Sequence, residues 1–326
     1  MKKALAATAA VWLSLGLSVG KSPAQSNEPV FPANIRMIVP LAAGGPTDVL
    51  ARIVAKSLSD RLGSTVYIEN KPGASGAIGT EMVARSPADG GTLLLTATHF
   101  LITPSLMKNL PYDPDKDFSP IALIAATPNA IVVNSEFKAK NIKELLALLK
   151  AEPGKYTFGS AGTGSANHLS GELFKQEAGV NIVHLPYKGN GPAMTDLIGG
   201  HIPMLFDSLP TVVNAAKTGK VRVLAITGLK RSQMLPDAPT LDESGLKGFN
   251  VEASFALYMP QAHNSPVYKK LVQAMREVNQ APFVRERFAE MGIEPGQLFG
   301  DDYTAYVRRE IARWKDVVRK ANIEPE

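Results

Sequence analysis

The chain has 326 residues, of which 45% are hydrophobic, and its formal net charge at pH 7 is +5. This length is enough to bury one large core or two cores of medium size. The chain has no cysteine, which excludes disulfides, iron–sulfur clusters, thiolate metal sites and a lipid anchor on cysteine. Lys and Arg form no clustered stripe, so nucleic acid is not expected as a partner.

The first residues have the pattern of a secretory signal peptide. Lys2 and Lys3 precede an apolar run over residues 4–20, and Ser22-Pro23-Ala24 offers small residues to a signal peptidase. A transmembrane anchor is the alternative, but a run of about 17 residues is at the lower end of what spans a bilayer. We therefore predict export with cleavage after Ala24. Cleavage removes three lysines and no acid, so the charge of the mature protein is 5 − 3 = +2.

Strands and helices alternate in the first third of the chain. Residues 35–40 are expected as a strand, after which Gly44-Gly45 and Pro46 open a helix that Gly63 ends. The next expected elements are a strand over 66–69, a loop over 70–76, a short helix to about 85 and a strand over 92–96. This alternation predicts a parallel sheet.

A long apolar run over 121–134, broken at Thr127-Pro128, is expected to be one strand that bends and leaves the first sheet. A second series follows, with helices expected over 142–150, 169–178 and 191–198 and strands over 156–158, 182–185, 203–207 and 221–227. A returning strand is expected over 255–259, and amphipathic helices over 267–279 and 302–321.

The sequence thus predicts two α/β domains. The first is discontinuous, over 31–126 and 252–326, and the second covers 127–251. In such sheets a ligand lies outside the carboxyl ends of the strands.

Two glycine-rich loops fall at that position. In the first, Gly44 and Gly45 allow close backbone approach, and the N–H groups of Thr47 and Asp48 are candidates to bind an anion. A plain turn is the alternative. The Asp48 charge would repel a carboxylate, so we expect it to accept hydrogen bonds from a ligand amine, a hydroxyl or an ordered water.

The second loop, over 159–172, carries four candidate donors: Ser160, Thr163, Ser165 and His168. The alternative is an ordinary surface loop before a helix that Ser165 caps. The density of glycine favours ligand binding. Tyr187 and Asp207 end the following segments and are candidates to line the same cleft.

Catalytic signals are weak. There is no G-x-S-x-G elbow, and the five histidines form no H-x-x-x-H pair, so neither catalysis nor a metal is expected. A complete nucleotide-binding motif is absent too, and no cofactor is expected.

At the level of motifs the chain resembles the Bug receptors, the periplasmic solute-binding proteins of tripartite tricarboxylate transporters. Pro40 with the loop over 44–48 resembles their P-x-x-x-G-G-x-x-D signature. ENKPGASGAIG over 69–79 resembles their E-N-R-P-G-A-G-G-x-I-G loop, and ADGGTLL over 88–94 resembles P-D-G-Y-T-L-L. With further matches over 159–169 and 184–200, the resemblance covers essentially the whole mature chain.

The resemblance implies a two-domain periplasmic binding protein fold of the Venus flytrap type. The domains would close on a small carboxylate held by backbone and hydroxyl donors, partly through ordered waters. It also implies membrane transporter subunits as partners, a monomeric receptor and a periplasmic location. The implied contacts are Gly44, Gly45, Thr47, Asp48, Ala74 and Ser75 in the first domain, and Ser160, Thr163, Gly164, Ser165, His168, Tyr187 and Asp207 in the second.

Two departures from the family pattern lie at the predicted mouth of the site. Leu41-Ala42-Ala43 replaces a common Phe-Pro-Pro, and Ser75 replaces a common glycine. Dicarboxylates, amino acids, aromatic acids and amides all remain open as ligands.

Two other functions are alternatives. One is a binding protein that serves a sensor kinase, which shares fold and pocket. The other is a hydrolase that uses Ser160 or Ser165, although the sequence shows no base near them in a known arrangement. A TRAP-class receptor usually grips its carboxylate with an arginine, and none falls inside these motifs.

Overall fold

The structure is a computed structural model that describes residues 31–325. The predicted signal peptide over 1–24, its cleavage after Ala24 and the alternative membrane anchor lie outside the described residues. Across residues 31–325, no helix combines the length and the apolar character needed to cross a bilayer.

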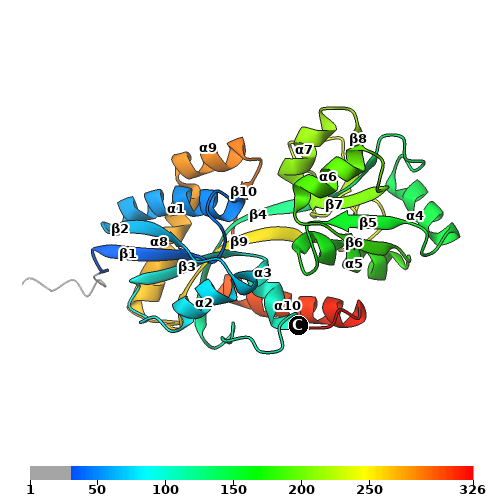
Figure 1. Ribbon diagram of the computed structural model, residues 1–326. Coiled ribbons are helices and arrows are strands. Elements are labelled where there is room, and N and C mark those ends of the chain that lie inside the picture. Colours follow the sequence, from blue (N-terminus) through cyan, green and yellow to red (C-terminus); the bar gives the residue numbers. More distant parts are fainter. Residues whose placement is uncertain (1–30, 326) are drawn as a thin grey trace, which may run out of the picture.

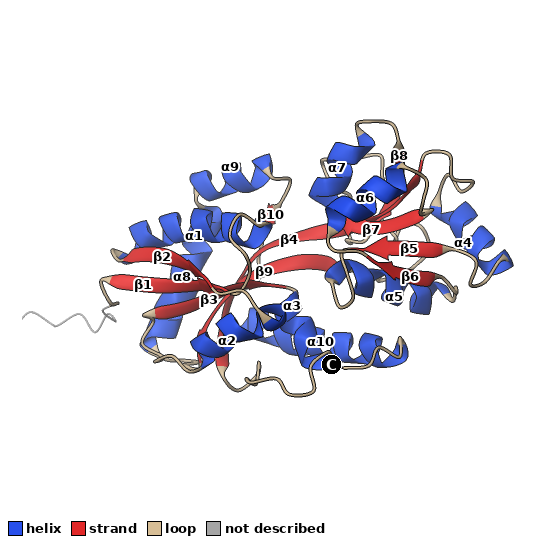
Figure 2. Cartoon of the chain, in the orientation of Figure 1, coloured by secondary structure: helices blue, strands red, loops and turns tan. Residues whose placement is uncertain are grey.

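The strands form one continuous mixed sheet with two halves (Figures 1 and 2). The main path runs β2-β1-β3-β9-β4-β7-β5-β6, and β8 and β10 pair with β4. The strands are β1 (Asn34–Val39), β2 (Thr65–Asn70), β3 (Thr92–Ala97), β4 (Phe118–Asn134), β5 (Thr157–Ser160), β6 (Val183–Pro186), β7 (Met204–Ser208), β8 (Val221–Ile226), β9 (Glu252–Pro260) and β10 (Glu294–Pro295). We call the half with β1 to β3 the first lobe and the half with β5 to β8 the second lobe.

Helices pack on both lobes (Figure 1). They are α1 (Pro46–Leu62), α2 (Ala77–Ala84), α3 (His99–Ile102), α4 (Ile142–Ala151), α5 (Ala166–Ala178), α6 (Asn190–Ile198), α7 (Leu209–Ala216), α8 (Pro266–Gln280), α9 (Pro282–Glu290) and α10 (Asp301–Lys320), with short 3-10 helices η1 (Ala74–Gly76) and η2 (Thr103–Ser105). Helix α1 begins at Pro46 and ends at Gly63, which has a left-handed φ of 66°, as the sequence predicts.

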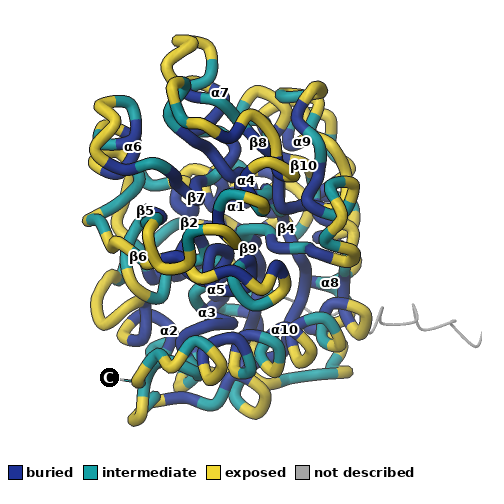
Figure 3. The backbone as a smooth tube through the Cα atoms, turned by 90° about the vertical axis from the view of Figure 1, so that its right-hand side faces the viewer, coloured by how far each residue is buried: buried dark blue, intermediate teal, exposed yellow. Residues whose placement is uncertain are grey.

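Two strands cross between the lobes. The first part of β4 pairs with β9 down to Pro128 opposite Glu252, and its last part, from Asn129, pairs with β7 and β8. The break at Thr127-Pro128 therefore lies within one strand that serves both halves, as the apolar run predicts. Figure 3 shows β4 and β9 buried at the centre of the molecule.

The sheet is mixed, which corrects the expectation of a parallel sheet. β1 pairs in parallel with β2 and β3, but β9 runs antiparallel to β3 because it returns from the second lobe. Helices α7 and α9 are not among the elements that the sequence predicts. The first buries Leu209, Val212 and Val213 and the second Val284 and Phe288, which is helical spacing, but the helices have only 8 and 9 residues, so each period is short.

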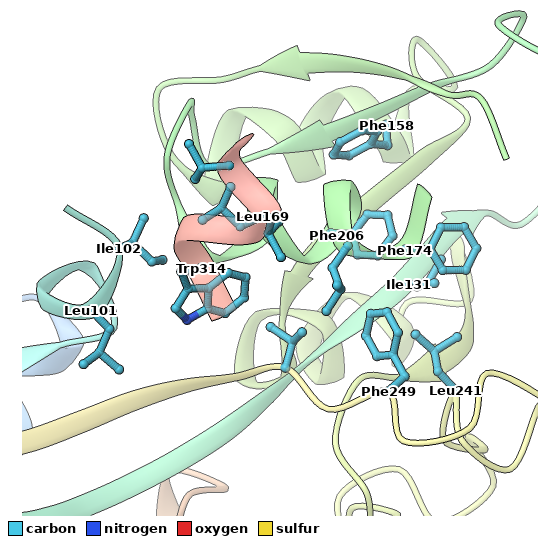
Figure 4. Packing of buried hydrophobic residues seen from close by; sticks show 14 of the residues in the cluster. Leu101, Ile102, Ile131, Phe158, Leu169, Phe174, Phe206, Leu241, Phe249 and Trp314 are labelled. Atoms are coloured by element: carbon cyan, nitrogen blue, oxygen red, sulfur yellow. The ribbon is translucent and has the colours of Figure 1, made fainter. Parts of the chain in front are cut away.

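One hydrophobic cluster spans both lobes. It joins Phe100 of the first lobe to Phe158 and Phe206 of the second through Trp314 of α10. Figure 4 shows Trp314 between Ile102 and Leu169. The lobes are thus connected by packing as well as by two strands.

Candidate functional site

A cavity of about 300 Å³ lies where the carboxyl ends of strands from both lobes meet. Its lining residues follow β1, β2 and β3 in the first lobe and β5 in the second, with two more from the end of the chain. They are Leu41, Ser75, His99, Thr103, Leu106, Met107, Thr163, Gly164, Ser165, Ile323 and Glu324. The lobes touch here, because a Cβ added to Gly164 would lie 2.6 Å from Cδ1 of Leu106. This is where a ligand of an α/β sheet is expected.

Other cavities are as large or larger, but they lie elsewhere. One of about 590 Å³ lies between the loop over 232–234 and the region of α9 and β10. It is not at the carboxyl ends of the parallel strands, and it contains none of the residues that the sequence predicts as ligand contacts.

The loop between β2 and α2 holds a strained backbone beside the cavity. Four consecutive residues, Gly73 to Gly76, have positive φ, and two of them, Ala74 at 45° and Ser75 at 52°, are not glycine. Each such residue costs about 1–3 kcal/mol. The common glycine of the family loop would fit this conformation better than Ser75 does. The strain places the exposed Ser75 at the cavity wall.

His99 forms the floor of this part of the cavity. Its Nε2 lies 3.1 Å from Oγ1 of Thr96, and a Cβ on Gly76 would come within 2.6 Å of the same nitrogen. Only glycine leaves room for the ring there. Burial lowers the pKa of His99 to about 4, so the imidazole is neutral at pH 7.

The buried Asp48 holds the loop between β1 and α1 in place by hydrogen bonds. Its carboxylate accepts hydrogen bonds from the backbone of Gly44 at 2.9 Å, from Asn70 at 3.0 Å and from two nitrogens of Arg52. Burial opposes ionisation, but the bonds from Arg52, Gly44 and Asn70 outweigh it and lower the pKa of the carboxyl. The structure thus gives Asp48 a role within the protein, and its expected contact with a ligand stays a prediction.

The loop between β5 and α5 presents its far end to the cavity. Ser165 caps α5, since its Oγ accepts the N–H of His168 at 3.1 Å and donates to the carbonyl of Gly162 at 2.7 Å. Thr163 is exposed at the cavity wall. The first turn of α5 has N–H groups that the helix cannot satisfy, and they carry partial positive charge.

Ser160 and His168 lie behind this loop. Oγ of the buried Ser160 is 2.7 Å from Nε2 of His184, and the His184 ring stacks on His168 at 3.8 Å between centroids. Nδ1 of His168 accepts the N–H of Gly164 at 3.1 Å, so this pair shapes the wall of the cavity. Burial lowers the pKa of His184 to about 4 and, with repulsion from His184, that of His168 to about 3.

Of the predicted contacts, the cavity brings together Ser75, Thr163, Gly164 and Ser165. The other predicted residues do not line it. They are Gly44, Gly45, Thr47, Asp48, Ala74, Ser160, His168, Tyr187 and Asp207. For these nine a ligand contact stays a prediction.

Tyr187 and Asp207 have different surroundings. The hydroxyl of Tyr187 donates to Oδ2 of Asp196 at 2.8 Å. Asp207 is fully buried, and its Oδ1 accepts the N–H of Ser208 at 2.6 Å while its Oδ2 has no partner among the described residues. Burial raises the pKa of Asp207 to about 7, although bonds from Ser208 and Asn190 oppose the shift.

Sequence reasoning missed most of the apolar and C-terminal lining. His99 was only one of five histidines, and nothing in the pattern over 103–107 pointed to a ligand. A signal did exist for Leu41, which departs from the family pattern at the predicted mouth. Ile323 and Glu324 follow a helix that was expected to cover the first domain, so no loop rule applied to them.

The pair of Ser160 and His184 corrects one part of the hydrolase alternative, because a base does lie near that serine. The serine of this pair is nevertheless not accessible to a substrate. Ser160 is completely buried, and its Oγ also accepts the N–H of Gly162 at 3.1 Å, so the hydroxyl is held inside its own turn.

Two α/β lobes joined by crossing strands, with a cavity at their facing carboxyl edges, define a periplasmic binding protein fold. The solved structure of the periplasmic binding protein BugD matches it with a TM-score of 0.73 and 39% identity, covering 91% of this chain and 100% of that one. Rpa4515 of R. palustris, solved with adipate, matches with a TM-score of 0.76 and 33% identity, over 90% of this chain and 99% of that one.

The sequence comparisons give the family. BugT of Bordetella pertussis is 37% identical over 293 residues, which is 89% of this chain and 90% of BugT. The model of the tripartite tricarboxylate transporter family receptor matches residues 50–323. The chain belongs to this family of periplasmic solute-binding receptors, as the motifs predict.

The strained loop yields a stability prediction. Ala74→Gly should stabilise the protein by about 1 kcal/mol, because glycine adopts a φ of 45° without strain. The control is Ala305→Gly, on the exposed face of α10, which should cost about 1 kcal/mol. Urea unfolding of both variants checks this, and a destabilised Ala74→Gly protein would contradict the strained conformation.

The contacts of Asp48 predict the effect of its neutralisation. Asp48→Asn should lower the free energy of unfolding by about 1–3 kcal/mol, because an amide cannot accept all four bonds. Asp237→Asn, at an exposed position, is the control and should stay within about 0.5 kcal/mol of wild type. An unchanged unfolding midpoint with weakened ligand binding would instead support the ligand contact that the sequence suggests.

Asp207 predicts a pH-dependent difference. Burial raises the pKa of Asp207 from its usual value of 3.8 to about 7 in the folded protein, so ionising the carboxyl costs stability as pH rises through that window. Asp207→Asn should therefore gain stability relative to wild type between pH 4 and pH 8, by up to about 4 kcal/mol at roughly 1.4 kcal/mol per pKa unit. Melting temperatures of both proteins across this range measure the effect. A constant difference would show that the carboxyl is not buried unpaired.

Proposed function

We propose that this receptor captures a small organic carboxylate in the cavity between its lobes and delivers it to a tripartite tricarboxylate-type membrane transporter. The observation that carries the proposal is the cavity at the carboxyl ends of β1, β2, β3 and β5, which both lobes line. Adipate in Rpa4515 shows that a relative holds a carboxylate.

The cavity offers the donors that a carboxylate needs. The hydroxyls of Ser75 and Thr163 line it, and it lies at the N-terminus of α5, beyond Gly164 and Ser165. The buried Thr103 also lines the cavity, but its hydroxyl donates to the carbonyl of His99 at 2.7 Å. Hydroxyls and a helix N-terminus stabilise an anion without a full positive charge. None of the lining residues is Lys or Arg, which agrees with the expectation from the motifs.

The division into domains over 31–126 with 252–326, and over 127–251, is part of the proposal. Helices α8 and α9 pack on α1, which supports their place in the first domain. Helix α10 contacts α3 in the first lobe and α5 in the second, so its last turns bridge the two. We propose that bending at the two crossing strands closes the lobes on the ligand, which shifts the equilibrium only if the closed form binds it better.

The proposal also includes a periplasmic location after cleavage at Ala24, a monomeric receptor, transporter subunits as partners and no catalytic activity. The homologues are solute-binding proteins, which supports the last point.

Loss of the Thr163 hydroxyl tests the carboxylate site. Thr163→Val should weaken binding of the preferred ligand from a carboxylate panel by about 1.5–3 kcal/mol, because a bond to a charged group is lost. Its melting temperature without ligand should not change, since Thr163 is exposed. Thr65→Val, exposed at the far end of β2, is the matched control and should bind like wild type.

Titration calorimetry on the three proteins decides the matter. Equal affinities in all three, or an equal loss in both variants, would show that the cavity is not where the carboxylate binds.

A further inference from the structure

Helix α10 extends from the first lobe to the second. Near its start, the hydroxyl of Tyr303 is 2.6 Å from that of Tyr258 on β9. Near its end, the amide of Gln176 on α5 donates to the carbonyl of Val317 at 3.1 Å. Trp314, only 1% exposed, lies between these points and packs in the cluster shared by both lobes (Figure 4). The helix is therefore held to the first lobe near its start and to the second lobe near its end.

The chain turns into the cavity directly after this helix. Asn322 adopts a left-handed φ of 52°, and the N–H of Ile323 returns to the carbonyl of Val318 at 3.2 Å. This ends α10 and brings Ile323 and Glu324 to the cavity, where they line it together with residues of both lobes. The end of the chain thus forms a third wall of the site.

The charged side chain of the cavity lining belongs to this third wall. Glu324 is the one Asp, Glu, Lys or Arg among the lining residues, and His99 is neutral at pH 7. Leu41, Leu106 and Ile323 supply an apolar surface beside it. A ligand whose first carboxylate is bound by hydroxyls and the α5 N-terminus therefore has an apolar wall and an acidic side chain around its remaining part.

We propose that Glu324 determines charge selectivity at this cavity, favouring a monocarboxylate with an apolar or cationic far end over a dicarboxylate. This inference rests on the proposed function, because it presumes that the cavity holds a carboxylate. Two negative charges about 4–6 Å apart repel measurably even in water-like surroundings. A cationic far end gains the corresponding attraction.

Three ligands with the same six-carbon chain test the proposal: hexanoate, adipate and 6-aminohexanoate. Their dissociation constants are measured by titration calorimetry on wild type, Glu324→Gln, Glu324→Lys and a control, Glu286→Lys. Glu286 is exposed on α9 and does not line this cavity. Glu286→Lys changes the net charge of the protein by the same amount as Glu324→Lys, but away from the site. Because Glu324 is exposed near the chain end, all variants are expected to fold, and melting curves verify this.

Wild type should bind hexanoate or 6-aminohexanoate more tightly than adipate. Glu324→Gln should shift the ratio of adipate to hexanoate affinity by about threefold toward adipate, and Glu324→Lys by about tenfold. Binding of 6-aminohexanoate should weaken in both variants. The shifts should shrink in about 0.5 M salt, where screening shortens the range of the charge.

Two results overturn the inference in different ways. If the ligands bind but the ratio is the same in Glu324→Lys and Glu286→Lys, the selectivity role fails and the carboxylate site stands. If neither these three ligands nor any other acid of the carboxylate panel binds any variant, both this inference and the proposed function fail.

Discussion

The continuity of β4 is the constraint on which the rest of the structure depends. One strand of 17 residues pairs with β9 in the first half of the sheet and with β7 and β8 in the second. Both halves therefore share one ladder of hydrogen bonds, and the boundary falls at Thr127 and Pro128. Proline has no N–H to give to the ladder, which makes this position a natural place for a strand to change partners. The carboxyl edges of the two halves then meet at one cavity.

The packing around α10 adds a second connection with different physics. Hydrogen bonds in β4 are directional, whereas the cluster around Trp314 is held by apolar packing, which is not directional. A receptor of this design needs lobes that move relative to each other without exposing a large apolar surface. Helix α10 contacts both lobes, and the residues that follow it line the cavity itself.

Much of the fold follows from local signals in the sequence. Helix α1 was predictable because Pro46, a regular apolar period and Gly63 agree on its limits, and the crossing was predictable from the apolar run of β4. Helices α7 and α9 are harder to predict, since each is short and shows its apolar period over only about two turns. At the site, glycine and hydroxyl patterns found Thr163, Gly164 and Ser165, which share one loop. The lining by His99 and Glu324 comes from segments that only the folded chain brings together, so no spacing rule could find them.

We expect one carboxylate to be held by both lobes at the carboxyl edges of the sheet. A crystal structure of the protein with a bound carboxylate from the panel tests it most directly. We expect ligand density in the cavity, in contact with Ser75 of the first lobe and with the segment from Thr163 to Ser165 of the second. Density in the cavity near α9 and β10, or contacts with a single lobe, would contradict it.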